Sequence, residues 1–553
     1  MRSRRGLCAF IALLFESFVL AGSALAQVNT VYISQNGGPF SGGSACNGQT
    51  TQTPAWFNTS SNWTSGTPSG RQIGPGTVVY LCGTLTSGLT FQGSGNSSNP
   101  IEILFDSGAN MTNRVWSSPA IALNSKSYII VDGGTPCGKD HGDDNLTACA
   151  SNQSGTGLIE NTANGTLLAN KVTSQFIVGG SGTGVNSCGS NIEIRNLLLL
   201  NAYVKSGADS STAADAAQGT WLVSCGSNIY IHDNTSTWGH ATLEIDASSN
   251  VSNWEVAYNV TAHATWGIKV AMGTDGVVLS NVRIHDNEIN NGTDWSDSSG
   301  QYHLDGIFDY GHSTSGYMNG VYVYNNYLHG TWGQGTQCPT GYIYLSGWMT
   351  NTYAFNNVIN VTGQYACNGD IAVAEEKSVH LYNNTIVSVQ VGEALGSAGT
   401  AASGGFVVGE NNVVYGTVYP VNFSSGAQSD FGTWDYNDYY NYTSDWRVGR
   451  SWYTWRQWQA QACGSGPCDA HGSIGNPKLA SSYPFTLGSG SAAIGLGANL
   501  YSVCNGQPNP GLGALCYDRL GNARPSTGKW DAGAYNGVVS APLPPTGVTA
   551  VLH

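Results

Sequence analysis

A short alternating strand that ends in an asparagine recurs along the middle of this chain. Its copies occupy residues 228–234, 253–259, 281–287, 320–326, 351–357 and 378–384. The asparagines that end these copies are 25 to 39 residues apart. In an extended strand alternate side chains share a face, so the apolar members of each copy point the same way. An earlier copy at 191–197 keeps the strand but places its asparagine one residue early, at Asn196.

This repeat predicts a β-solenoid. Each coil of a solenoid buries its inward side chains only against the coils above and below it, which requires one strand pattern at one phase. Asparagines at the same turn then stack and hydrogen-bond from coil to coil. A β-sandwich and a β-propeller are the alternatives, but propeller blades recur at about 40 to 50 residues with signatures of their own. The 74 glycines and frequent Asn, Ser and Thr favour short strands and tight turns over helices.

The Asn-terminated strands resemble those of the pectin lyase-like right-handed parallel β-helix superfamily. The resemblance covers about residues 28–537, with an opening segment at 73–81 and 100–105 and a closing segment at 524–525 and 530–535. It implies an all-β fold, a right-handed parallel β-helix with three sheets per coil and an asparagine ladder between the second and third sheets. It also implies a substrate cleft along the first sheet. The expected first-sheet strands are 243–246, 268–271, 307–310, 343–345 and 371–375.

The chain divides into four parts. Residues 1–26 carry arginines, an apolar stretch and a small-residue cleavage site, and we interpret them as a signal peptide. Residues 27–421 form the predicted β-helix, and the Trp- and Tyr-rich residues 422–537 are expected to cover or cap it. Residues 538–553 are interpreted as a proline-rich linker tail. No later segment is apolar enough to cross a bilayer, so we expect a secreted, extracellular protein. We also expect a monomer.

The cysteines indicate an oxidising compartment. Of the 13 cysteines Cys8 lies in the signal peptide, and the other 12 form an even set, which suits disulfides. Proximity suggests three local pairs, and the remaining six cysteines are paired in chain order. The expected pairs are Cys137–Cys149, Cys463–Cys468, Cys504–Cys516, Cys46–Cys82, Cys188–Cys225 and Cys338–Cys367. No CxxC pair occurs, which disfavours zinc.

The charge balance narrows the class of partner. The net charge of −14 argues against nucleic acid, which needs a basic surface. It also weakens the argument for a strongly anionic substrate, although local patches can differ from the net charge. A polysaccharide is the expected partner, because the resemblance is to extracellular polysaccharide-active β-helix proteins.

The stretch 301–311 holds the predicted catalytic residues. In an extended strand His303, Asp305 and Asp309 point one way, while Leu304 and Phe308 point the other way. Carboxylates that face a core are costly unless they are paired, which favours the outward phase for both aspartates. The leading hypothesis is therefore a glycoside hydrolase with Asp305 and Asp309 as acid and base.

Two charged residues on neighbouring first-sheet strands are added to this site. Glu244 and Lys269 are expected within one or two coils of Asp309, and two coils make roughly 10 Å, near the carboxyl separation of inverting glycosidases. Lys269 and His303 are assigned as orienting groups. Two other functions stay open. One is a lyase in which Lys269 or His303 abstracts a proton beside a uronate and acidic residues bind calcium; the other is a non-catalytic glycan-binding or adhesin solenoid. No cofactor is expected to be required, and no metal site is assigned.

Aromatic residues near the expected cleft are candidate sugar platforms, because flat apolar ring faces stack on sugars with little ordering cost. The substrate-binding candidates are Trp266, Trp295, Tyr310, Trp332, Tyr344 and Trp348. A second aromatic and polar stripe lies on the outward face of the second sheet. It comprises Tyr230, Arg283, Tyr322, Tyr353 and His380, with His232, His285, Tyr324, Phe355 and Tyr382 beside them. This second-sheet stripe is expected to lie under the aromatic C-terminal segment.

Overall fold

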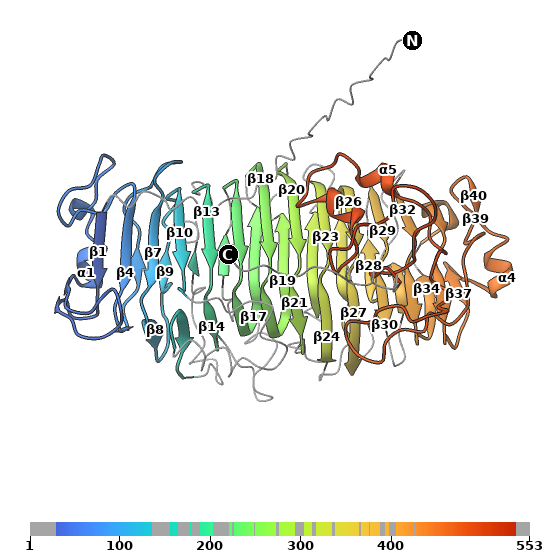
Figure 1. Ribbon diagram of the computed structural model, residues 1–553, viewed down its shortest axis with the longest axis horizontal. Helices are drawn as coiled ribbons and strands as arrows, with labels where there is room; N and C mark the ends of the chain where they lie inside the picture. Colours follow the sequence, from blue (N-terminus) through green and yellow to red (C-terminus); the bar gives the residue numbers. More distant parts are fainter. Residues whose placement is uncertain are drawn as a thin grey trace, which may run out of the picture.

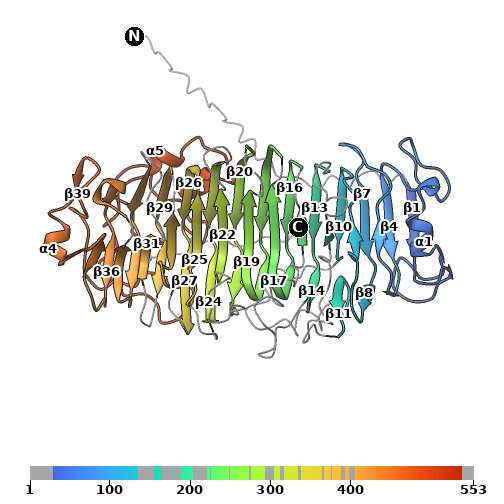
Figure 2. The ribbon, with the colours of Figure 1, turned by 180° about the vertical axis from the view of Figure 1, so that it is seen from behind.

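The protein forms one long β-helix, drawn from the side in Figure 1 and from behind in Figure 2. The computed structural model describes residues 29–537, apart from 135–154, 164–176, 179–188, 203–220, 224–225, 248, 273–275, 293–303, 312–316, 334–337, 364–365, 375–376, 388–392, 398–404 and 425. In this part of the chain nearly every strand pairs in parallel with the strand one coil away. The prediction of an all-β parallel β-helix is confirmed.

One face of the helix is a sheet of 13 described strands, hereafter the 13-stranded sheet. Its strands, in order, are β1 (Asn29–Ile33), β4 (Thr77–Leu81), β7 (Ile101–Phe105), β10 (Ile129–Asp132), β13 (Ile192–Arg195), β16 (Ile229–His232), β18 (Val251–Ala257), β20 (Val278–His285), β23 (Tyr317–Tyr324), β26 (Met349–Phe355), β29 (Ser378–Tyr382), β32 (Phe406–Glu410) and β35 (Phe431–Asp435). These strands include the Asn-terminated copies, so this sheet is the second sheet predicted from the sequence.

The first and third sheets join into one sheet of 23 described strands. They are β5 (Thr84–Leu85), β6 (Leu89–Thr90), β8 (Asn110–Asn113), β9 (Ile121–Ala122), β11 (Leu158–Asn161), β12 (Ile177–Val178), β14 (Leu198–Leu200), β15 (Trp221–Val223), β17 (Thr235–Ala247), β19 (Val260–Met272), β21 (Glu288–Asn290), β22 (Asp305–Gly311), β24 (Tyr327–Trp332), β25 (Gly341–Gly347), β27 (Val358–Gly363), β28 (Ile371–Ala374), β30 (Thr385–Val387), β31 (Glu393–Ser397), β33 (Val413–Tyr415), β34 (Tyr419–Phe423), β36 (Asp438–Tyr440), β37 (Trp446–Val448) and β38 (Ser451–Tyr453). β17 and β19 run through both sheets without a break, which is why the two merge.

Short elements complete the described structure. They are the hairpins β2 (Gly38–Pro39) with β3 (Thr50–Thr51) and β39 (Ala462–Cys463) with β40 (Gly466–Pro467), and the helices α1 (Pro54–Phe57), η1 (Ser60–Asn62), η4 (Gln428–Asp430), α4 (Trp455–Trp458), α5 (Tyr501–Cys504) and η5 (Leu512–Cys516). α1 lies at the first coil and α4 at the last, so each covers one end of the helix (Figure 1).

The core follows the period of the strands. In the 13-stranded sheet Ile231, Val256, Ile284 and Val323 are partners in successive strands, and none of them is exposed. Each coil therefore adds one apolar layer to the stack. At roughly 25 cal/mol for each Å² of apolar surface removed from water, this repeated burial is the main stabilising contribution of every coil.

The predicted asparagine ladder is confirmed and is longer than expected. Its members are Asn234, Asn259, Asn287, Asn326, Asn357, Asn384, Asn412 and Asn437. Each side-chain amide donates to the side-chain oxygen of the next member at 2.9–3.0 Å, and each backbone N–H donates to the same oxygen. The column ends when Asn437 donates to Asp469.

Asn196 lies outside this ladder for a reason in the backbone. Each ladder asparagine follows a residue with positive φ, such as Asp233 at 54° and Asp286 at 53°. Asn196 itself has φ 59° and so occupies that preceding position. Asparagine tolerates this conformation better than most residues. Leu197 takes the ladder position instead, and its backbone N–H donates to Asn234 Oδ1 at 3.0 Å.

The C-terminal residues both continue and cover the helix. The coils extend past residue 421, because β35 pairs with β32 and β37 pairs with β34. Residues 479–537, which we call the C-terminal cover, lie against the outside of the solenoid. Figure 1 shows this segment, in red, crossing the strands near β26 and β32.

Four of the six expected disulfides are confirmed: Cys46–Cys82, Cys338–Cys367, Cys463–Cys468 and Cys504–Cys516. The other four cysteines, Cys137, Cys149, Cys188 and Cys225, lie outside the described residues. In the described part of the chain, no helix has the length and apolar character needed to span a membrane.

Candidate functional site

The predicted catalytic carboxyls lie inside the β-helix. Asp305 and Asp309 in β22 are both fully buried, and they share the inward phase of the strand with Ile307 in the core. The side chains of β22 alternate as expected, but the aspartates point inward. The prediction that both carboxyls point outward is therefore wrong. The reason is that Phe308 and Tyr310 take the outward positions, where they join an aromatic cluster.

Burial decides the charge of these two aspartates. Asp305 Oδ1 accepts a hydrogen bond from the Gly341 N–H at 3.1 Å. Neither carboxyl oxygen of Asp309 has a hydrogen-bond partner among the described residues. Burial raises the pKa of both carboxyls well above the ordinary range of aspartate. Neither carboxyl can contact a polymer outside the helix, so their assignment as acid and base has no geometric support.

Asp309→Asn is expected to stabilise the protein at neutral and alkaline pH. Below the unfolded pKa of about 3.9 both the folded and the unfolded protein carry the proton, so the substitution changes no ionisation. Above it only the unfolded chain releases the proton, which favours unfolding by about 1.4 kcal/mol per pH unit up to the raised folded pKa. Urea denaturation at pH 4, 6 and 8 should show a gain that grows with pH. A gain of the same size at all three pH values would contradict the neutral, buried carboxyl.

The outer face over the expected cleft is aromatic. Trp266, Tyr310 and Tyr344 belong to one cluster there, with Phe308 stacked on Tyr344 at a ring distance of 5.4 Å. The Lys269 ammonium lies 4.8 Å from the centre of the Trp266 ring. Tyr344 is only 7% exposed, so the cluster presents little ring surface to a sugar.

The other tryptophans have different environments. Trp332 is 1% exposed and belongs to the core, and its Nε1 donates to the His329 carbonyl at 2.6 Å. The prediction that Trp332 binds substrate is therefore wrong, because a core ring cannot stack on a sugar. Trp348 is half-buried, and the Lys377 ammonium lies 4.2 Å from its ring centre. Trp295 lies outside the described residues.

The charged first-sheet residues are brought together only in part. Glu244 and Lys269 are direct partners in the pairing of β17 with β19. His303 lies outside the described residues. The roles assigned to Glu244, Lys269 and His303 therefore stay predictions.

The second-sheet stripe is covered over one half of its length. Tyr324, Phe355 and Tyr382 pack against the C-terminal cover, including Leu515 and Trp530, in one buried cluster. This part of the prediction is confirmed. On the strands from β7 to β13 the outward positions hold Glu102, Asp132, Glu193 and Arg195.

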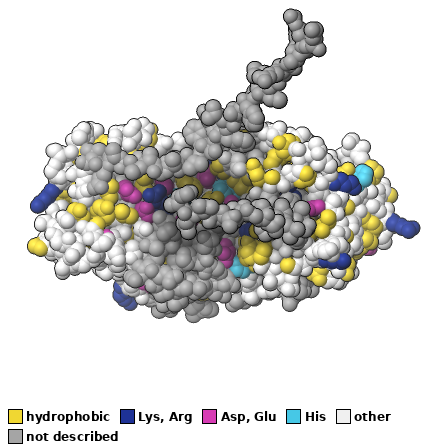
Figure 3. Space-filling model, viewed as in Figure 1, with side chains coloured by type: hydrophobic (Ala, Val, Ile, Leu, Met, Phe, Trp, Pro, Cys, Tyr) yellow, Lys and Arg dark blue, Asp and Glu magenta, His cyan; other side chains and the backbone are white. Residues whose placement is uncertain are grey.

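Charged side chains gather on this other half of the 13-stranded sheet. Only 10% of the chain is charged, so their concentration on one sheet face is unusual. Figure 3 shows acidic, basic and histidine side chains on this face of the molecule. The charged cluster comprises Glu102 on β7, Asp132 on β10, Glu193 and Arg195 on β13, and His232 with Asp233 at the end of β16.

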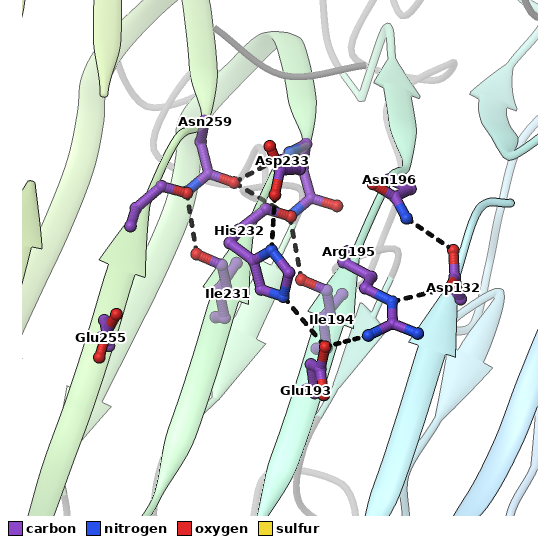
Figure 4. Close-up of polar contacts among 12 residues, drawn as sticks. Asp132, Glu193, Ile194, Arg195, Asn196, Ile231, His232, Asp233, Glu255 and Asn259 are labelled. Carbon is purple, nitrogen blue, oxygen red and sulfur yellow. Dashed lines mark hydrogen bonds and ion pairs between the residues drawn. The ribbon is translucent and has the colours of Figure 1, made fainter. Parts of the chain in front are cut away.

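Arg195 holds three carboxyl groups together. Its Nε donates to Asp132 at 2.7 Å, and one terminal nitrogen donates to Glu193 (Figure 4). The other terminal nitrogen lies 3.5 Å from Glu102. Strand register places Glu102 and Glu193 on either side of Ile130, so they are two strands apart. Their side chains are 20% and 28% exposed, and both can therefore reach a ligand.

A histidine and an aspartate complete the charged cluster. His232 Nε2 lies 3.1 Å from Glu193, and its Nδ1 lies 2.7 Å from Asp233 (Figure 4). The Tyr230 ring stacks on the imidazole at 3.9 Å between centroids. These bonds and the Tyr230 ring fix the imidazole plane and hold the Glu193 carboxylate in place.

The environment separates the pKa values of the two glutamates. Burial, reinforced by the negative charge of Asp132, raises the pKa of Glu102 to about 7. Burial also acts on Glu193, but hydrogen bonds and positive charge from His232 and Arg195 lower its pKa below the ordinary value. The carboxylates beside His232 raise the pKa of the imidazole. At slightly acid pH the site therefore contains one protonated and one ionised glutamate.

A second polar group follows along the same sheet. Glu255 on β18 accepts from Arg283 Nε at 3.0 Å and Nη2 at 2.7 Å, and it lies 3.3 Å from His285 Nε2. His285 Nδ1 lies 2.9 Å from Asp286. The arrangement of glutamate, histidine and aspartate thus occurs twice on this face.

Four residues of the charged cluster were not predicted from the sequence: Glu102, Asp132, Glu193 and Arg195. The signal was present, because residues 101–105 and 192–195 place charged side chains at outward positions of otherwise apolar strands. Their meeting depends on the register through Ile130, which lies outside the Asn-terminated copies. Among the described residues, no three His, Cys, Asp or Glu side chains are grouped to hold a metal ion.

No protein-family model matches the chain, and no curated protein matches it significantly. Among solved structures, the chain is similar to the crystal structure of pectate lyase Pel9A. The match covers 93% of this chain and 98% of that chain, with 12% sequence identity and a TM-score of 0.37.

Proposed function

We propose that this chain is a secreted hydrolase that cleaves a polysaccharide on the outer face of the 13-stranded sheet. The observation that carries the proposal is the pair Glu102 and Glu193, which Arg195 holds together and whose pKa values are shifted in opposite directions. Two carboxyl groups with pKa values pushed apart are the arrangement that glycoside hydrolysis requires.

The opposite pKa shifts assign the role of general acid to Glu102 and that of general base to Glu193. Glu102 carries a proton up to a pH of about 7 and donates it to the glycosidic oxygen as the C–O bond breaks. Glu193 is ionised and takes a proton from the water whose oxygen bonds to the anomeric carbon. Two strand spacings, roughly 10 Å, separate the two backbones, and Arg195 brings the two carboxyl groups closer together than that.

Neighbouring residues position the pair. Arg195 and His232 keep Glu193 ionised and fix its direction, while Asp132 keeps Arg195 in place. Tyr230 follows Glu193 in the strand register and offers a ring face to a sugar. The elongated sheet face suits a polymer, and the signal-like residues 1–26 with four disulfides in the described residues support secretion.

The test is incubation with a panel of polysaccharides, followed by measurement of reducing ends and of ultraviolet absorption. Hydrolysis is expected to yield reducing ends without absorption. An absorbing, unsaturated product would instead show a lyase, and saturable binding without new chain ends would show a binding protein. Either result would overturn the proposal that the protein is a hydrolase.

The rate of hydrolysis is expected to follow the two glutamates as pH changes. It should fall above pH about 7, because Glu102 then loses the proton that it must donate. It should also fall in acid below the ordinary glutamate range, where Glu193 gains a proton. A pH profile of kcat/KM measures both limbs. A rate that rises steadily from pH 7 to 9 would exclude Glu102 as the acid.

A further inference from the structure

A pocket lies where the charged face meets the C-terminal cover. It has a volume of about 530 Å³ and is open to solvent. Its floor is the 13-stranded sheet, with Glu255, His285 and Tyr324, and one wall is the cover, with Tyr517 and Asp518. The proposed cleavage site on β7 and β13 lies on the same sheet face, farther toward the first coil.

The wall of this pocket is rigidly attached to the sheet. The Gly511 N–H donates to the Tyr324 hydroxyl at 3.3 Å, and the Asn356 side chain donates to the Tyr517 carbonyl at 2.9 Å. The disulfide Cys504–Cys516 joins α5 to η5 directly before Tyr517. The cover therefore closes the sheet face at this point.

The lining determines the class of ligand. The pocket is lined by the carboxyl groups of Glu255, Asp286 and Asp518 and by the cationic side chains of His285 and Arg519. Glu255 is already paired with Arg283 and His285, and Asp286 is paired with His285, so these charges balance one another and favour an uncharged ligand. Tyrosine rings and hydroxyls, together with asparagine amides and carboxylates, suit the hydroxyl groups and flat faces of an uncharged sugar.

We propose that this pocket binds the terminal, uncharged sugar unit of the polysaccharide, so that the enzyme cleaves near a chain end. The inference rests on the proposed function, because it places the pocket beside Glu102 and Glu193. The pocket begins beside Glu193, at Tyr230 on β16, and extends to His285 on β20. The strands from β13 to β20 span three spacings, or about 14 Å, which leaves room for roughly two or three sugar units. The products are short oligosaccharides released from one end.

Binding measurements test the pocket apart from cleavage. The ligands are cellotriose, xylotriose, mannotriose and trigalacturonate. Every protein in the experiment carries Glu102→Gln, so that no ligand is cleaved during the measurement. Tyr517→Ala should weaken the binding of the preferred neutral trisaccharide at least tenfold. Trp452→Ala is the matched control, because Trp452 at 45% exposed and Tyr517 at 40% are both surface rings, and Trp452 lies on β38 far from the pocket.

The outcomes separate the pocket from the cleavage site. Neutral trisaccharide binding that Tyr517→Ala weakens and Trp452→Ala leaves unchanged supports the pocket, even where wild type cleaves nothing. Failure of all three neutral trisaccharides to bind, tighter binding of trigalacturonate, or equal binding by the Tyr517→Ala protein overturns it. With an active enzyme, a rapid early fall in polymer viscosity would also overturn it, because that fall shows internal cleavage.

Discussion

Glu102→Gln is expected to lower kcat by about 10²- to 10⁴-fold, the usual contribution of a general acid. Glutamine keeps the shape of a protonated glutamate and its packing beside Arg195, but it cannot donate an acidic proton to a leaving oxygen. At neutral pH the substitution also removes a carboxyl whose pKa burial raises to about 7, so the protein should not lose stability. Steady-state rates and thermal unfolding, measured together, check both expectations.

Glu410→Gln is the matched control. Glu410 on β32 lies in the same sheet, and burial with the nearby charge of Asp435 raises its pKa to about 7, as for Glu102. It lies on the far side of the C-terminal cover, away from Arg195. The Glu410→Gln protein should keep wild-type turnover. If both variants lose activity alike, or neither does, Glu102 is not the acid.

Asn287→Ala is expected to lower the free energy of unfolding by about 3–5 kcal/mol. The Asn287 side chain donates to the Val256 carbonyl and to Asn326, and it accepts from both the backbone and the side chain of Asn259. Alanine removes all four hydrogen bonds and leaves buried donors and acceptors without partners. Urea denaturation of the purified protein measures the loss.

Asn253→Gly provides the comparison for the ladder. Asn253 belongs to a second, exposed row of amides, in which it donates to Asn228 and accepts from Asn281. Its φ of 62° suits glycine, so the substitution removes the amide without backbone strain. The expected loss is below about 1 kcal/mol, because water replaces exposed partners. A loss for Asn287→Ala as small as this would show that the column contributes no more than surface amides do.

The sequence predicts the architecture well because the architecture repeats. Each Asn-terminated strand indicates the coil length, the phase of the core and the position of the ladder. The column from Asn234 to Asn384 is present as expected. The one irregular copy is also informative, since Asn196 fills the left-handed turn position next to the ladder.

The site was harder to predict because it depends on single strands and on contacts between distant coils. The stretch 305–311 alternates carboxyls with aromatic residues, and the cost of burying a carboxylate argued for outward aspartates. Asp309 avoids that cost by remaining protonated, which the pattern alone does not reveal. Glu102 and Glu193 are 91 positions apart in the sequence, and only the register through β10 brings them to one guanidinium.

The amide column has a direction, and this has a consequence for the last coil. Every member donates toward the C-terminal end, and the final partner also faces the Tyr439 hydroxyl and the Trp458 N–H, so it must accept on both sides. Asp469 meets this need, and its other oxygen accepts from the Tyr439 hydroxyl and from Trp458 Nε1. An asparagine there would oppose donor to donor. The same carboxyl that terminates the polarised row thus holds Tyr439 and Trp458 over the last coil, and a covered end is a protection against edge-to-edge pairing with another chain.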